Sequence, residues 1–131
     1  MSKYAYPAIF TKEEKGYSVE FPDIEGCYTC GDTLPEAMEM AEDALCLVLY
    51  DLEESGDELP KVSDIKYLQN QSKELVSLVF CDTIEYRKRF DNKAVKKTLT
   101  IPAWLNTMAE KQGVNFSTTL QNALKQQLAV Q

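Results

Sequence analysis

Residues 96–131 follow the pattern of one short strand and two helices, which so short a chain cannot fold in isolation. Lys96 to Ile101 alternates between polar and apolar residues, Pro102 ends the strand, and Gly113 separates two amphipathic helices. A lone strand leaves its backbone N–H and C=O groups unpaired, and so few residues cannot enclose a hydrophobic core. We therefore expect a two-fold dimer, in which two copies of the strand pair antiparallel above four helices.

The two faces of this predicted ribbon differ in chemistry. Because side chains alternate along a strand, Leu99 and Ile101 would enter the dimer core while Lys96, Thr98 and Thr100 point outward. A two-stranded ribbon fits the major groove of B-DNA, where lysine can donate to guanine and threonine offers a hydroxyl and a methyl group. The outward face is therefore either a DNA-reading surface or the solvated side of the ribbon. The expected dimer core comprises Leu99, Ile101, Trp104, Leu105, Leu120 and Leu124.

The start of the second C-terminal helix is a candidate phosphate site. Asn115 or Ser117 can cap this helix, and the backbone N–H groups near Ser117 and Thr118 would then be free to bind an anion. Contacts of this kind anchor a protein on the DNA backbone without reading its sequence. We expect Ser117 and Thr118 to hold a phosphate on each side of the groove.

Charge is distributed unevenly along the chain. Residues 1–82 carry 18 Asp and Glu against 6 Lys and Arg, a formal charge of −12, whereas residues 83–131 carry 3 acids and 8 bases, a charge of +5. An acidic surface repels nucleic acid and attracts a basic protein, while a basic segment can approach phosphates. The asymmetry predicts two separate tasks, although charge that only maintains solubility would look the same.

The pattern of residues 1–82 predicts an α+β domain. Strands are expected at Tyr4–Phe10, Tyr17–Phe21, Cys27–Thr29 and Leu75–Phe80. A helix is expected between a cap at Asp32-Thr33 and a stop at Gly56, because apolar residues recur there at three- and four-residue spacing. The order β-β-β-α-β favours an antiparallel sheet with the helix on one face. Residues 83–95 are then a linker or a short helix, and residues 96–131 form a separate C-terminal domain.

Two stretches of the sequence resemble a known protein family. KKTLTIPAWLNTMAEKQGVNFSTTLQNALKQQL, residues 96–128, resembles the ribbon-helix-helix domain of Arc/MetJ-type repressors and, more narrowly, the C-terminal domain of HicB antitoxins. FPDIEGCYTCGDTLPEAMEMAEDAL, residues 21–45, resembles the HicB motif, in which a strand ends in Phe-Pro-Asp, a Gly-Cys turn follows and a Gly-Asp-Thr segment opens the helix. Together the two stretches cover 58 of the 131 residues and lie in both predicted domains.

The resemblance implies a fold, a partner and a set of contacts. HicB antitoxins pair with HicA, a small basic toxin that has a double-stranded-RNA-binding-like fold and cleaves mRNA. Their N-terminal domain resembles a truncated ribonuclease H fold and covers the toxin, and their C-terminal domain binds the operator and represses the operon. For this chain the resemblance implies a homodimer, with tetramers left open, and neither cofactor, metal nor catalytic residue. It places DNA contacts at Lys96, Thr98 and Thr100 and toxin contacts at Asp23, Glu25 and Asp32.

Four cysteines and the absence of histidine limit metal and redox chemistry. Cys27 and Cys30 have the spacing of a metal-binding or redox pair, but a structural zinc site needs four nitrogen or sulfur ligands. Cys46 lies in a helical apolar stripe and Cys81 ends a strand, so packing explains each of them. In a reducing compartment we expect neither a zinc site nor a structural disulfide.

Two other functions are compatible with this sequence. A nuclease of ribonuclease H type would need clustered carboxylates around two metal ions, and no spacing in the chain forces four of its acids together. A ligand-responsive ribbon-helix-helix repressor would bind a small molecule in its N-terminal domain. The sequence has no signal-like start and no run of about 18 apolar residues, which predicts a cytoplasmic protein without a membrane span.

Overall fold

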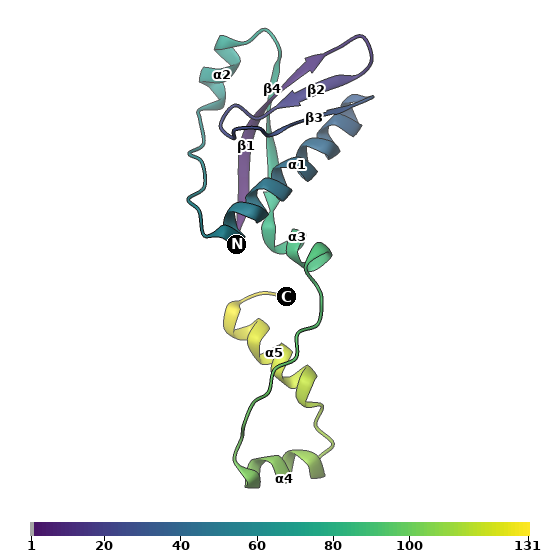
Figure 1. Ribbon diagram of the computed structural model, residues 1–131, viewed down its shortest axis with the longest axis vertical. Coiled ribbons are helices and arrows are strands. Elements are labelled where there is room, and N and C mark those ends of the chain that lie inside the picture. Colours follow the sequence, from purple (N-terminus) through teal and green to yellow (C-terminus); the bar gives the residue numbers. More distant parts are fainter. Residues whose placement is uncertain (1) are drawn as a thin grey trace. The chain divides into compact units, whose positions relative to one another are not determined.

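The computed structural model describes residues 2–131 and divides the chain into two compact units, residues 1–93 and 94–131 (Figure 1). The N-terminal unit contains a four-stranded sheet and three helices, and the C-terminal unit contains two helices. No helix among residues 2–131 is long and apolar enough to cross a membrane.

The sheet of the N-terminal unit is antiparallel throughout, in the order β3-β2-β1-β4. Its strands are β1 (Lys3–Lys12), β2 (Tyr17–Glu20), β3 (Tyr28–Gly31) and β4 (Leu75–Asp82). The long strand β1 pairs with β4 along most of its length, from Lys3 opposite Asp82 to Phe10 opposite Leu75. The predicted antiparallel sheet is therefore confirmed, and β4 is one of its two edges.

Helix α1 (Leu34–Ser55) covers one face of this sheet (Figure 1). Thr33 caps it by accepting a hydrogen bond from the Glu36 N–H, and Gly56 ends it in the left-handed conformation, with φ of 72°. The buried stripe of the helix consists of Ala37, Ala41, Leu45, Cys46 and Leu49. This stripe packs against Tyr6, Ala8, Phe10 and Val19 of the sheet to form the hydrophobic core.

The sequence pattern does not predict helix α2 (Ile65–Gln71), which lies between α1 and β4 along the chain. None of its residues is buried, so no apolar stripe marks it in the sequence. The side chain of Gln69, near the end of α2, forms hydrogen bonds with backbone groups at the start of β4. Its side-chain oxygen accepts from the Val76 N–H at 3.0 Å, and its side-chain nitrogen donates to the Glu74 carbonyl at 3.0 Å.

Residues 83–90 are a helix, α3 (Thr83–Phe90), which begins immediately after β4. Asp82 caps the helix, because its carboxylate accepts hydrogen bonds from the N–H groups of Ile84 at 3.0 Å and Glu85 at 3.2 Å. Aromatic contacts join α3 to α1, with the Tyr86 ring centroid 5.4 Å from that of Tyr50. Helix α3 therefore belongs to the N-terminal unit.

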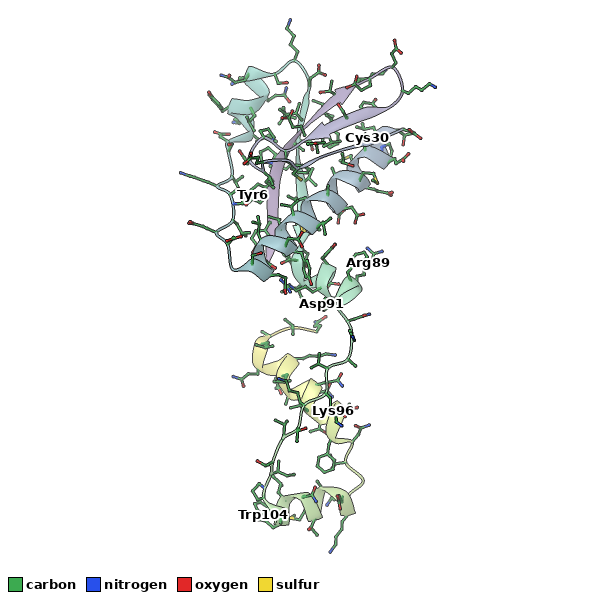
Figure 2. The ribbon with its side chains drawn as sticks, viewed as in Figure 1. Tyr6, Cys30, Arg89, Asp91, Lys96 and Trp104 are labelled. Atoms are coloured by element: carbon green, nitrogen blue, oxygen red, sulfur yellow. A yellow bond between two sulfur atoms is a disulfide. The ribbon has the colours of Figure 1, made fainter. Side chains whose placement is uncertain are left out.

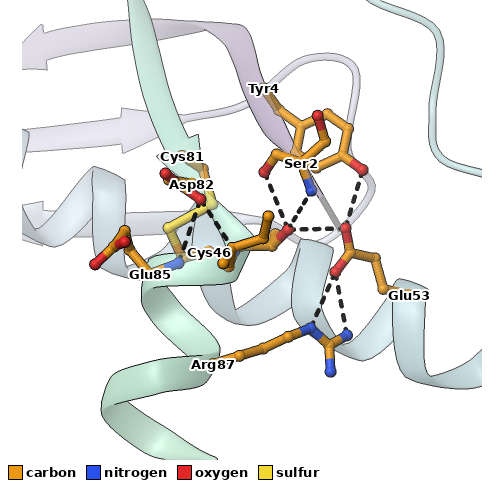
Figure 3. Close-up of a disulfide and its surroundings, with 10 residues drawn as sticks. Ser2, Tyr4, Cys46, Glu53, Cys81, Asp82, Glu85 and Arg87 are labelled. Carbon is orange, nitrogen blue, oxygen red and sulfur yellow. Dashed lines mark hydrogen bonds and ion pairs between the residues drawn. A yellow bond between two sulfur atoms is a disulfide. The ribbon is translucent and has the colours of Figure 1, made fainter. Parts of the chain in front are cut away.

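A single carboxylate, that of Glu53 on α1, links three elements (Figure 3). The Tyr4 hydroxyl of β1 and the Thr83 hydroxyl of α3 each donate to it at 2.9 Å. The Arg87 guanidinium of α3 donates to its other oxygen at 3.1 Å, and the Arg87 side chain is itself mostly buried. These bonds hold the start of β1 and the whole of α3 against the C-terminal half of α1.

The structure corrects the prediction that no cysteines pair, because Cys46 and Cys81 form a disulfide (Figure 3). Cys46 lies on the buried stripe of α1 and Cys81 near the end of β4, with their Cα atoms 5.5 Å apart. The sequence separation of 35 residues hides this proximity, which arises only when α1 packs across the sheet. Cys27 is a buried free thiol, whose pKa burial raises, and Cys30 is an exposed free thiol.

The C-terminal unit contains helices α4 (Ala103–Lys111) and α5 (Phe116–Leu128). Gly113 between them has a positive φ of 67°, as expected for the turn that ends α4. Residues 96–101 do not form the predicted strand in the described chain. The physical reason is that a strand needs a second strand to pair with, and this unit offers none.

Candidate functional site

The predicted DNA-reading residues lie on an extended, exposed segment of the C-terminal unit. Lys96, Thr98 and Thr100 are all exposed and precede α4. Figure 2 labels Lys96 on this segment. No sheet fixes which way these side chains point, because this segment has no strand partner in a single chain. The structure therefore leaves the outward face of the predicted ribbon as a prediction.

The start of α5 differs in one respect from its predicted form. Asn115 is the cap, and its side-chain oxygen accepts a hydrogen bond from the Thr118 N–H at 3.0 Å. The Thr118 N–H is therefore occupied and is not free to bind a phosphate. Ser117 and Thr118 both lie exposed in the first turn, so their hydroxyls remain available.

The C-terminal unit has no buried residue, and all of its residues lie in the described part of the chain. Leu99 is 63% exposed and Trp104 is 65% exposed, although both are large apolar side chains. The other large apolar side chains of the unit that are exposed are Val95, Ile101, Leu105, Met108, Val114, Phe116, Leu124 and Leu128. A unit with this much uncovered apolar surface lacks a core of its own, and exposed apolar surface of this kind is typical of an interaction site.

The three acids predicted to contact a toxin do not form one cluster of free charges. Asp23 accepts two hydrogen bonds from Ser63, one from its backbone N–H at 2.8 Å and one from its hydroxyl. These bonds join the turn after β2 to the segment that precedes α2. Glu25 and Asp32 are exposed, and the Asp32 N–H donates to the Glu36 carboxylate at 3.3 Å.

Sequence reasoning missed a large groove in the N-terminal unit. It has a volume of about 920 Å³ and lies between α1, the end of β4 and α3. Its apolar lining comes from Met40, Cys46, Phe80, Tyr86 and Phe90, and its charged lining from Glu39, Glu42, Asp43, Asp82, Glu85, Lys88 and Arg89. The acids of α1 look like an ordinary solvated helix face in the sequence, because only the fold places α3 beside them.

Among residues 2–131, no group of three or more Cys, Asp or Glu side chains is placed to hold a metal ion. The Cys27-to-Cys30 spacing does not bring these two sulfurs into a pair, since both thiols are free. The acids Asp23, Glu25 and Asp32 lie in and around turns, whereas the acids that line the groove belong to α1, β4 and α3.

A family model described as the HicB-like antitoxin of bacterial toxin–antitoxin systems matches residues 6–126. A 14.9 kDa protein from the rep-hol intergenic region of Haemophilus phage HP1 is 36% identical over 103 residues, which cover 76% of this chain and 74% of that protein. Antitoxin HicB 2 of Photorhabdus laumondii is 43% identical over 58 residues, which cover 44% of this chain and 42% of that protein.

Solved structures share the fold of this chain. A chain in a toxin–antitoxin complex from Streptococcus pneumoniae is 33% identical and superposes with a TM-score of 0.60, covering 95% of this chain and 99% of that one. The antitoxin HicB of Burkholderia pseudomallei is 21% identical, with a TM-score of 0.56 over 92% of this chain and 96% of that one, and shows the same fold. From the match over residues 6–126, the chain belongs to the HicB-like antitoxins of bacterial toxin–antitoxin systems.

Proposed function

We propose that this chain binds and neutralises a small basic HicA-like toxin that cleaves mRNA, and that it represses its own operon by binding operator DNA. The observation that carries the proposal is the match along 95% of the chain to a protein solved as part of a toxin–antitoxin complex. The charge of −12 on residues 1–82 supports a basic partner for this part, which in our proposal has a truncated ribonuclease H fold. No described feature favours a nuclease or a ligand-binding repressor over this function.

When this chain is added to the toxin in a near-stoichiometric amount, it is expected to stop the cleavage of mRNA by the toxin. Because opposite charges steer the encounter and are screened over about 8 Å at physiological ionic strength, the association rate should fall as salt is added. RNA fragments on a gel and stopped-flow association rates measure the two effects. An unrelated protein of equal negative charge is the control, and full cleavage in the presence of excess antitoxin chain would reject the proposal.

We further propose that residues 96–131 form a ribbon-helix-helix homodimer. The exposed apolar side chains of the C-terminal unit support this, because pairing two copies would cover them and would give residues 96–101 the strand partner that a single chain lacks. In the dimer, Lys96, Thr98 and Thr100 of both copies would lie on the ribbon face that enters the major groove.

Thr98→Ala and Lys96→Ala are each expected to weaken binding to the operator more than binding to random DNA. A lost base contact costs about 1–3 kcal/mol, and the two-fold dimer presents each position twice. Ser117→Ala should weaken binding to both duplexes by the same factor, because a phosphate contact carries no sequence information. Titrations on operator and scrambled duplexes at one salt concentration measure this. Wild-type operator affinity in both Thr98→Ala and Lys96→Ala would show that the ribbon does not read the bases.

A further inference from the structure

We infer that the groove between α1 and α3 is the docking surface for a basic segment of the toxin that carries an apolar anchor. This inference rests on the antitoxin function proposed above and names the surface that performs it. The groove lies entirely within the N-terminal unit, and its volume of about 920 Å³ is large enough to receive side chains from a partner.

Two aromatic side chains of the apolar lining are exposed to solvent. Phe80 at the end of β4 is 53% exposed and Phe90 at the end of α3 is 63% exposed. Tyr86 extends this surface, with its ring centroid 4.7 Å from that of Phe90. Exposed aromatic side chains that converge on one hollow mark a site where a partner buries apolar surface.

The charges around this lining set the chemistry of the partner. Glu39, Glu42 and Asp43 follow one another on the same side of α1, and no hydrogen bond or cation within the described chain engages them. The other two acids of the groove are already used, since Asp82 caps α3 and Glu85 pairs with Lys88 at 2.9 Å. The three unpaired carboxylates therefore favour a partner that brings Lys or Arg side chains to α1.

The negative field also reaches the aromatic lining. Burial raises the pKa of Tyr86, and the carboxylates of Asp43 and Asp51 raise it further. The same field repels nucleic acid, so the partner is a basic protein segment. An apolar residue of that segment would pack on Phe80 and Phe90 while its cations approach α1.

The elements that form the groove, α1, β4 and α3, are cross-linked to one another, which favours tight binding. The Cys46–Cys81 disulfide joins α1 to β4 at its base, with Cys46 itself in the lining. The bonds from Thr83 and Arg87 to Glu53 fix α3 against α1. A surface that is already ordered loses little conformational entropy when its partner arrives.

The test measures the affinity of the 131-residue chain for a catalytically inactive form of the HicA-like toxin proposed as its partner. Reversing two of the free charges, in the double variant E42K/D43K, is expected to weaken binding by at least about tenfold. The matched control is E14K/E58K, which changes the net charge equally at exposed positions outside the groove and should change affinity by less than about threefold. If E42K/D43K has a lower melting temperature than wild type, the milder variant E42Q/D43N, which removes the two charges without reversing them, is used for the affinity measurement instead.

The apolar half of the groove is tested separately. Phe90→Ala is expected to weaken binding by about tenfold, mainly through faster dissociation. Leu75→Ala, which truncates a 50% exposed apolar side chain of β4 outside the groove, is the control and should bind like wild type.

The outcomes separate the surface from the function. If wild type binds the toxin and both E42K/D43K and Phe90→Ala bind it equally well, the groove is not the docking surface and the antitoxin function stands. If wild type does not bind the toxin, the antitoxin function itself fails and the inference fails with it. If groove variants change the molar mass of the free chain but not its toxin affinity, a second copy occupies the groove and the inference is overturned.

Discussion

Leu99→Asp is expected to abolish dimer formation and operator binding together. In the single chain Leu99 is 63% exposed, and the unit that contains it has no buried residue. Dimerisation would bury this side chain from both copies, so the substitution places two unpaired carboxylates in the only apolar interior the unit can form. Burial of an unpaired charge is among the most destabilising single changes, and here it acts twice.

Molar mass by light scattering and titration of operator DNA measure the two losses. Trp104, the only tryptophan of the chain, gives a third signal, because its 65% exposed indole should become buried in the dimer and return to solvent in Leu99→Asp. Leu47→Asp makes the same change on an exposed position of α1 and should leave the mass unchanged. A Leu99→Asp protein with the mass of wild type would show that the proposed ribbon is not the dimer interface.

Toxin neutralisation should survive this substitution. The groove and the acidic surface belong to residues 1–93, which have their own core and do not depend on Leu99. A variant that neutralises the toxin but neither dimerises nor binds DNA would separate the two proposed functions, as the opposite charges of the two parts of the chain suggest.

The sequence predicts α1 well because local signals and tertiary packing agree there. Thr33, Pro35 and Gly56 specify where the helix begins and ends, and its apolar residues share one face. The antiparallel strands follow from the same kind of agreement. Helix α2 escapes sequence reasoning because it buries no residue, so only its hydrogen bonds to the start of β4 reveal its role.

Features that form between distant parts of the chain cannot be predicted from local sequence patterns. Cys46 and Cys81 each look like ordinary packing residues, and they meet only because α1 crosses the end of β4. The groove has the same origin. In the sequence Glu42 and Asp43 look like part of a solvated helix face, and only the fold places α3 beside them. The alternation of residues 96–101 predicts a strand, but no strand forms there in a single copy of the chain, because a strand needs a second strand to pair with.

The charge of the Glu53 carboxylate is expected to stabilise the N-terminal unit. Burial by itself would raise the pKa of its carboxyl, but the hydrogen bonds that it accepts, including those from Thr83, Tyr4 and Arg87, outweigh burial and lower the pKa from 4.5 to about 2. A pKa that is lower in the folded than in the unfolded state contributes stability above the unfolded value. That contribution is lost as the pH falls from about 4.5 to about 2.

Glu53→Gln is therefore expected to lower the free energy of unfolding at pH 7 by about 3 kcal/mol, the equivalent of the pKa difference. Because glutamine resembles the protonated carboxyl, the deficit should shrink below pH 4.5 and vanish near pH 2. Denaturant unfolding of both proteins at several pH values measures it. Glu54→Gln is the matched control, since its half-exposed carboxylate also pairs with Arg87 and should contribute less than about 1 kcal/mol. A deficit that is equally large at pH 3 and pH 7 would show that the charge of Glu53 does not stabilise the fold.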